Sequence, residues 1–191
     1  PVLGEMEQRG LVIDGYWADD ARIEERERDS SEAREISRLR ADSQWTGLYF
    51  GGTAFKKQRV VDPAHYVQAA SEASRWMGVV TTSGPGTGQI ADLSKIANFR
   101  TGVAQRPLAI ASGITPENVG DYAREADAIL VATGINRPGN FYEIDQGRLT
   151  RLLDNCRQSY VLGESSLVTG IEGDERWYLR YMAPTVKGDT F

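Results

Sequence analysis

Short apolar runs alternate with amphipathic segments along most of this chain. The apolar runs lie at residues 45–50, 78–82, 107–111 and 128–132. The amphipathic segments, with apolar residues at helical spacing, lie at residues 62–77, 93–103, 119–126 and 145–156. Strands that alternate with helices at this spacing predict parallel β-α-β units joined by right-handed crossovers. The pattern therefore predicts an α/β fold built on a parallel sheet.

Three helix starts are indicated by their capping residues. Thr115 precedes Pro116, and proline is favoured at the first position of a helix. Asp62 precedes Pro63 in the same way, and Asp145 stands before the last amphipathic segment. We therefore expect Thr115, Asp62 and Asp145 to be N-caps.

The ends of two neighbouring apolar runs are similar to each other. One run ends in Ser112-Gly113 and the next in Thr133-Gly134. In a (β/α)8 barrel, the loops after the seventh and eighth strands form a phosphate site with a helix N-terminus. We therefore predict parallel (β/α) units of a TIM barrel, strands 5–8, with residues 1–3 as the remnant of strand 4. Residues 1–158 would form this barrel portion, and residues 159–191 a C-terminal extension.

The same two turns are the main candidate for ligand binding. Glycine lets a backbone approach an anion closely, and the free N–H groups at a helix start point toward it. Ser112, Gly113, Thr133 and Gly134 are therefore expected to hold a phosphate group. The alternative is that both glycines serve only to allow close strand-to-helix turns.

A glycine-rich loop follows the second of the four apolar runs. Its glycine spacing matches neither a P-loop nor a dinucleotide fingerprint, but at the carboxyl end of a barrel strand it could hold phosphate or sugar hydroxyls. A tight surface turn is the alternative. The candidate ligand residues of this loop are Thr82, Ser83, Gly84, Gly86, Thr87 and Gly88.

Lys56 and Asp14 are the candidate catalytic residues. Lys56 follows the first apolar run, where it could neutralise phosphate or, with a lowered pKa, form a Schiff base; Arg59 is an alternative anion partner. Asp14 is expected in the loop after the strand-4 remnant, on the same rim. Asp127 precedes the last strand and is therefore expected at the opposite, stabilising face.

The composition of the chain argues against several classes of protein and of site. The net charge of −5 argues against a nucleic-acid-binding face, and no apolar run is long enough to span a membrane. One cysteine and one histidine exclude an internal disulfide and a Cys/His metal site, and a cytoplasmic location is the default expectation. The highly charged residues 19–42 predict a solvent-facing helical surface, with a partner-binding arm as the alternative.

Taken together, the strand ends resemble those of the BtpA-type family of TIM-barrel proteins and, more distantly, of ribulose-phosphate-binding barrels. The matching stretches are residues 8–15, Phe55-Lys56, Thr82-Ser83-Gly84, Thr87-Gly88, residues 111–115, Glu117-Asn118, residues 131–135 and residues 145–153. The chain departs from that family at Lys57, where histidine is common, and it lacks the first barrel strands. The resemblance implies a barrel related to photosystem biogenesis or sugar use, and it leaves the reaction undefined.

Two functions follow from these patterns. The first is an enzyme, or a protein derived from one, that binds a phosphorylated sugar or nucleotide-like ligand at the C-terminal rim of the barrel. Its reaction would be an isomerisation, a lyase reaction or the cleavage of a glycosidic bond, and no cofactor is identified. The second is a non-catalytic assembly or regulatory protein that retains the barrel pocket. Because half a barrel exposes strand edges, we also expect a homo-oligomer or a complementary chain that completes the barrel.

Overall fold

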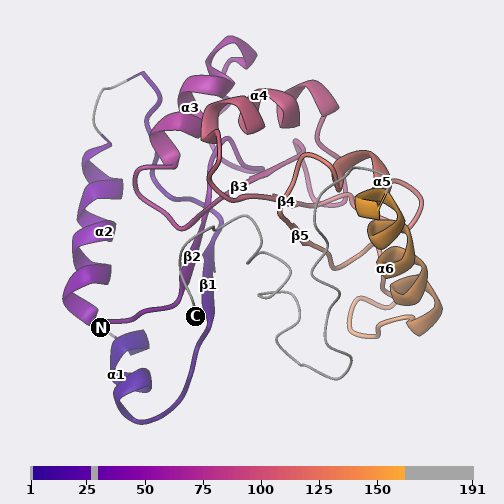
Figure 1. The fold of residues 1–191 in the computed structure, drawn as a ribbon, viewed down its shortest axis with the longest axis horizontal. Helices are drawn as coiled ribbons and strands as arrows, with labels where there is room; N and C mark the ends of the chain where they lie inside the picture. The colour runs from indigo at the N-terminus through magenta and orange to yellow at the C-terminus, as the bar shows by residue number, and fades with distance from the viewer. Residues whose placement is uncertain (1, 27–29, 162–191) are drawn as a thin grey trace.

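The computed structural model describes residues 2–26 and 30–161, which form a parallel sheet bordered by helices (Figure 1). The five strands follow one another in the sheet in sequence order, and all neighbouring pairs are parallel. They are β1 (Gly15–Ala18), β2 (Leu48–Gly52), β3 (Val79–Ser83), β4 (Leu108–Ala111) and β5 (Ala128–Leu130). The predicted parallel α/β class is confirmed, and the sheet curls as part of a barrel would.

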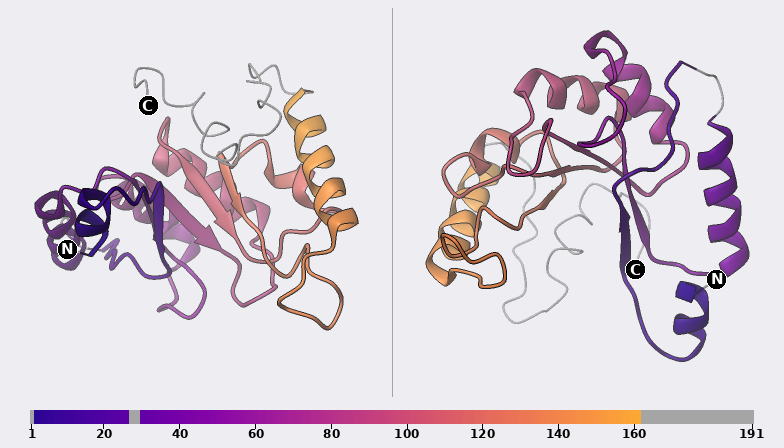
Figure 2. Two further views of the ribbon diagram at one scale, coloured as in Figure 1. Left: turned by 90° about the horizontal axis from the view of Figure 1, so that it is seen from below. Right: turned by 180° about the vertical axis from the view of Figure 1, so that it is seen from behind.

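Helices line the outer side of this curl. They are α1 (Val2–Gln8), α2 (Ser31–Ser43), the 3-10 turn η1 (Pro63–His65), α3 (Tyr66–Ala73), α4 (Leu93–Val103), α5 (Val119–Tyr122) and α6 (Gln146–Val161). The further views show the sheet curling between α2 at one end and α6 at the other (Figure 2). Helix α6 runs through the boundary predicted at residue 159, and the extension from residue 162 on lies outside the described residues.

The N-terminal region differs from the sequence prediction. Residues 2 and 3, expected in a strand remnant, lie in helix α1. The edge strand is instead Gly15–Ala18, which pairs in parallel with Leu48–Gly51 of β2. Asp14 therefore lies before β1, at the amino end of the strands, and the prediction that it follows a strand is wrong. Its backbone carbonyl accepts a hydrogen bond from the N–H of Leu48, the first residue of β2 (2.8 Å).

Side chains along each strand point alternately to the two faces of the sheet, so the buried residues form two separate clusters. Tyr49, Val80 and Ile110 belong to a large cluster shared with the helices, whereas Phe50 and Val79 belong to a small cluster on the other face. Successive side chains of a strand point to opposite faces, so the larger core is sandwiched between the sheet and α3–α6. From α4 this core receives Ile96, Phe99 and Val103.

Of the three predicted N-caps, Asp62 and Asp145 are confirmed and Thr115 is not. The Asp62 carboxylate accepts a hydrogen bond from the Ala64 N–H (2.9 Å), and that of Asp145 accepts one from the Arg148 N–H (3.0 Å). The helix expected directly after Thr115 begins later, at Val119. A turn precedes it, in which the Asn118 side chain accepts from the Thr115 N–H (2.8 Å) and donates to the Gly113 carbonyl (2.9 Å).

The amino edge of the sheet is held together by Asp127. Its carboxylate accepts hydrogen bonds from the Leu108 N–H (2.8 Å) and from the Arg100 guanidinium (2.5 Å). These contacts tie the start of β4 to the start of β5 and to α4. The structural role predicted for Asp127 is therefore confirmed.

Candidate functional site

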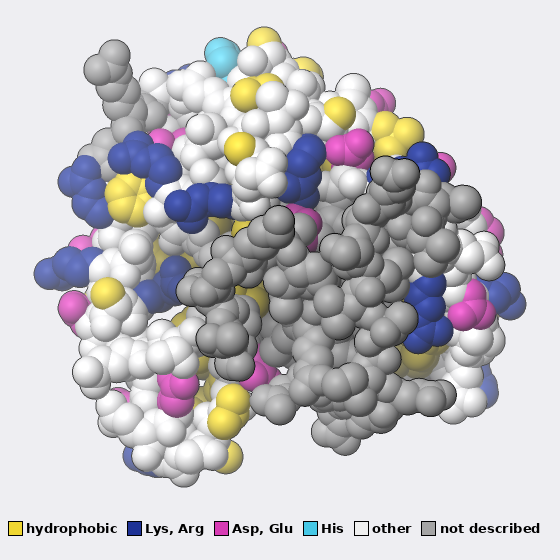
Figure 3. Space-filling view, in the orientation of Figure 1, with side chains coloured by type: hydrophobic (Ala, Val, Ile, Leu, Met, Phe, Trp, Pro, Cys, Tyr) yellow, Lys and Arg dark blue, Asp and Glu magenta, His cyan; other side chains and the backbone are white. Residues whose placement is uncertain are grey.

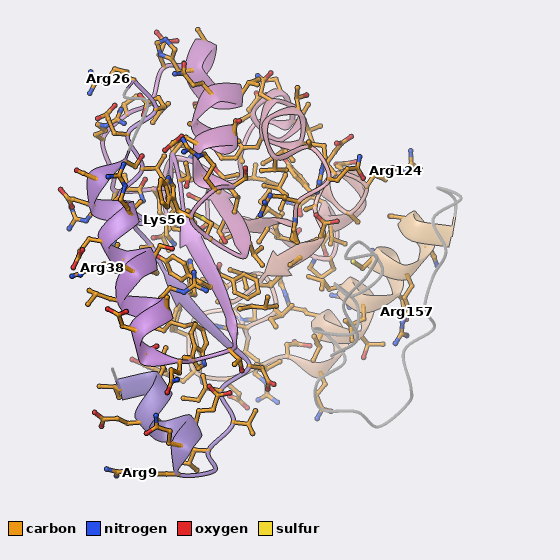
Figure 4. The ribbon with its side chains drawn as sticks, turned by 60° about the vertical axis from the view of Figure 1, so that its left-hand side comes forward. Arg9, Arg26, Arg38, Lys56, Arg124 and Arg157 are labelled. Carbon is orange, nitrogen blue, oxygen red and sulfur yellow. The ribbon has the colours of Figure 1, made fainter. Side chains whose placement is uncertain are left out.

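Three of the predicted site residues meet at the carboxyl edge of the sheet. The Lys56 ammonium donates a hydrogen bond to the Ser112 hydroxyl (2.9 Å), and the Lys56 backbone N–H donates to the Ser83 hydroxyl (2.8 Å). The three residues follow or end β2, β3 and β4. Figure 4 shows Lys56 beside the strand ends, whereas Arg9, Arg124 and Arg157 project from the periphery.

The turn that carries Ser112 has an uncommon backbone. Ser112 has a φ of 71° and Gly113 a φ of 72°, so two successive residues are left-handed. A left-handed residue with a Cβ costs on the order of 1–3 kcal/mol, and such residues are enriched at active sites and ligand-binding turns. This conformation places the Ser112 hydroxyl within hydrogen-bond distance of Lys56.

The turns at residues 112–113 and 133–134 lie side by side, as expected from neighbouring strand ends. Gly134 packs against the neighbouring turn, and Gly113 packs against residues 89–90 of the loop after β3. A Cβ built at Gly134 would lie 1.8 Å from the Ile114 carbonyl oxygen, and one at Gly113 would lie 2.4 Å from the Ile90 backbone nitrogen. This packing accounts for both glycines without a ligand, and phosphate binding by the two turns stays a prediction. Among the side chains at this edge, the Lys56 ammonium contacts the Ser112 hydroxyl.

Only some of the residues predicted in the glycine-rich loop lie at this edge. Ser83 is buried and its hydroxyl also donates to the Gly84 carbonyl (2.8 Å), whereas Thr87 and Gly88 are exposed. Thr82 shares the helix-covered face with Val80, on the opposite side of the sheet from Ser83. Gly84 and Gly86 pack against Gln89 within the loop, and Thr133 is exposed beyond β5.

The other charged residues predicted for the site, Arg59 and Asp14, do not join Lys56. The Arg59 guanidinium pairs with Glu25, whose carboxylate is buried, and with Glu24 (3.2 Å). These hydrogen bonds and charges hold the pKa of Glu25 below its ordinary value, with Arg59 the largest cause. Arg59 is therefore occupied by carboxylates, and Asp14 lies at the opposite edge. Among the described residues, no carboxylate lies within ion-pairing distance of Lys56.

The charged region at residues 19–42 forms ion pairs within itself. Arg26 pairs with Glu24 (2.9 Å), and Arg38 pairs with Glu35 one turn away (3.0 Å). Lys and Arg side chains gather near the start of α2 in the space-filling view (Figure 3). A surface helix from Ser31 agrees with the predicted solvent-facing segment, while residues 19–26 contain no helix.

Sequence reasoning missed Lys95, in the first turn of α4. Its ammonium donates hydrogen bonds to the backbone carbonyls of Ala54 (2.6 Å) and Ser83 (2.7 Å). It also lies 5.2 Å from the ring centroid of Tyr66 and 5.8 Å from that of Phe99. Burial lowers the pKa of Lys95 from 10.5 to about 8.

We expect the Lys95 amine to titrate near pH 8 in the folded chain. Below pH 8 the Lys95 amine is protonated in both the folded and the unfolded chain. Burial of this positive charge then lowers the free energy of unfolding. The free energy of unfolding therefore gains a contribution as pH rises from about 8 to 10.5, because the unfolded chain then binds more protons. The titration can be followed through the lysine Cε signals in carbon-13 NMR, with Lys95→Met as the assignment control. A Lys95 signal that moves only near pH 10.5 contradicts this prediction.

No protein-family model matches the chain, and a search of curated proteins finds no match. The resemblance to BtpA-type barrels therefore remains a prediction. Among the described helices, none combines the length and apolar character needed to cross a membrane. Within residues 2–26 and 30–161, no three His, Cys, Asp or Glu side chains are grouped to hold a metal ion.

Proposed function

We propose that this chain binds a phosphorylated small molecule, such as a sugar phosphate or a nucleotide-like ligand, at the carboxyl edge of its sheet. The observation that carries the proposal is the 2.9 Å contact between the Lys56 ammonium and the Ser112 hydroxyl. An ammonium has three N–H donors, and a serine hydroxyl can both donate and accept. Among the described residues Lys56 has no carboxylate partner, so its charge is available to neutralise an anion.

The position of the pair supports the same proposal. In parallel α/β sheets, ligands bind outside the carboxyl ends of the strands, where loops from several strands converge. Lys56, Ser83 and Ser112 come from three successive strand ends of this kind. Because consecutive parallel strands end at the same edge of the sheet, the fold itself brings these loops together.

Binding is better supported than proton-transfer chemistry. Asp14 was the carboxylate expected to work beside Lys56 as an acid or base, and it lies at the amino edge. Without it, the edge retains a cation and hydroxyl groups, which suit recognition of a phosphate. This observation favours the regulatory or sensing alternative over an isomerase or lyase, although both would use the same ligand site.

Calorimetric titration with ribose 5-phosphate, ribose and inorganic phosphate tests the proposal. We expect ribose 5-phosphate and inorganic phosphate to bind and ribose alone to bind far more weakly, because the charge-assisted contacts go to the phosphate. Raising the salt concentration should weaken binding, since the contact is electrostatic. Equal affinity for ribose and ribose 5-phosphate, or no binding of either phosphate compound, overturns the proposal.

A further inference from the structure

Lys95 is placed to act on the Lys56 site through the backbone. Its two carbonyl partners belong to residues next to that site: Ala54 lies two positions before Lys56, and Ser83 ends β3. The Ser83 hydroxyl in turn accepts from the Lys56 N–H (2.8 Å). One ammonium on α4 therefore holds both segments that fix the Lys56 backbone.

The segment after β2 needs such a restraint because its backbone is strained. Ala54 has a φ of 46° and Lys57 a φ of 64°, two left-handed residues on either side of Lys56. Neither is glycine, and each such residue costs on the order of 1–3 kcal/mol unless its surroundings impose it. The Ala54 carbonyl that Lys95 holds belongs to one of these two residues.

The surroundings of Lys95 suit a structural cation. Two carbonyl oxygens accept from it, and the faces of Tyr66 and Phe99 lie within cation-π distance. Asp92 is the N-cap of the same helix, and its carboxylate accepts a hydrogen bond from the Ser94 N–H (2.7 Å). No ion pair joins Lys95 to a carboxylate among the described residues, so its donors are directed to the backbone of the two strand ends.

We propose that Lys95 is a positioning residue for anion binding: it holds the turn after β2 in the conformation that brings the Lys56 ammonium to Ser112. This inference rests on the proposed function of the Lys56 site. Among the described residues, the hydrogen bonds of Lys95 go to the carbonyls of Ala54 and Ser83 and not to Ser112, so it acts through the backbone of these two residues. Its lowered pKa agrees with an ammonium that is packed under the site.

The test compares Lys95→Met with Lys95→Arg in the full chain, using ribose 5-phosphate as the probe. Methionine keeps an apolar stem against Tyr66 and Phe99 but donates no hydrogen bond. We expect the dissociation constant of Lys95→Met to rise about tenfold, the effect of losing a charge-assisted bond. Arginine retains N–H donors, so Lys95→Arg should bind more tightly than Lys95→Met.

A double-mutant cycle with Ser112→Ala separates positioning from a general loss of stability. If Lys95 acts through the Lys56–Ser112 pair, Ser112→Ala should weaken binding much less in the Lys95→Met chain than in the unsubstituted chain. Additive effects of the two substitutions overturn the inference, as does unchanged binding by Lys95→Met. Failure of the unsubstituted chain to bind the probe overturns the proposed function instead.

Amide hydrogen exchange tests the restraint without a ligand. In Lys95→Met we expect faster exchange of the Lys56 amide, whose hydrogen bond depends on the position of Ser83. The amide of Val80, which donates to the Pro107 carbonyl (3.1 Å) within the sheet, should keep its protection. Equal acceleration of both amides indicates general destabilisation, and no acceleration of the Lys56 amide shows that Lys95 does not hold the turn; either result contradicts the inference.

Discussion

Replacing Lys56 with methionine is expected to raise the dissociation constant for ribose 5-phosphate by about tenfold to a hundredfold, the range for losing a hydrogen bond to a charged group. The substitution removes the ammonium that contacts Ser112 but keeps a side chain of similar length. Lys56 is only half-buried, so the free energy of unfolding should change little. Calorimetric titration measures the loss, and urea unfolding confirms that the fold is retained.

Lys57→Met is the matched control for this experiment. Lys57 is the next residue, carries the same charge and is exposed. Its removal lowers the net positive charge near the site by the same amount, so it reports the contribution of charge alone. If Lys57→Met weakens binding as much as Lys56→Met, a diffuse field and not the Lys56–Ser112 contact attracts the ligand, and the assignment of Lys56 is wrong.

Replacing Phe99 with alanine is expected to lower the free energy of unfolding by about 3–5 kcal/mol, the usual cost of removing a buried phenyl ring. Phe99 is fully buried in the core between α4 and the sheet, with its ring 5.9 Å from that of Tyr66. Alanine leaves a cavity that the neighbouring strand residues fill only partly. Urea unfolding followed by circular dichroism measures the change.

Leu93→Ala in the same helix is the control for Phe99→Ala. Leu93 is exposed at the start of α4, so its removal should change stability by no more than about 0.5 kcal/mol. If both substitutions cost the same, the α4 side of the core is not packed as described. The pair thus tests which face of α4 meets the sheet.

The sequence predicted the central β-α units because their signals are local. Each strand is a short apolar run, and Asp62 and Asp145 cap their segments through contacts with residues two or three positions away. β1 was missed because its four residues follow an apolar stretch and carry partly exposed aromatic side chains, Tyr16 and Trp17, which is typical of an edge strand. Pairing with β2, a contact that is distant in sequence, makes these residues a strand.

The site was predictable in part, for a related reason. The positions of Lys56, Ser83 and Ser112 follow from the rule that parallel strands end at one edge, which requires only the strand boundaries. Asp14 was misplaced because its position depended on the missed strand. Lys95 carries a signal that could have been used: it lies four residues before Phe99, so both side chains lie on the same side of α4. Its partners are backbone carbonyls, which the sequence does not mark.

The sequential strand order also bears on how the chain acquires its structure. In the described sheet, each strand from β2 to β5 pairs with the strand directly before it in the sequence, so its partner has already been synthesised. During synthesis, every new β-α unit can dock on the edge left by its predecessor, a growth process that proceeds from the N-terminal side. The contact between Lys56 and Ser112 can then form only when the fourth strand has emerged, because Ser112 follows β4, while Lys56 is in place two strands earlier.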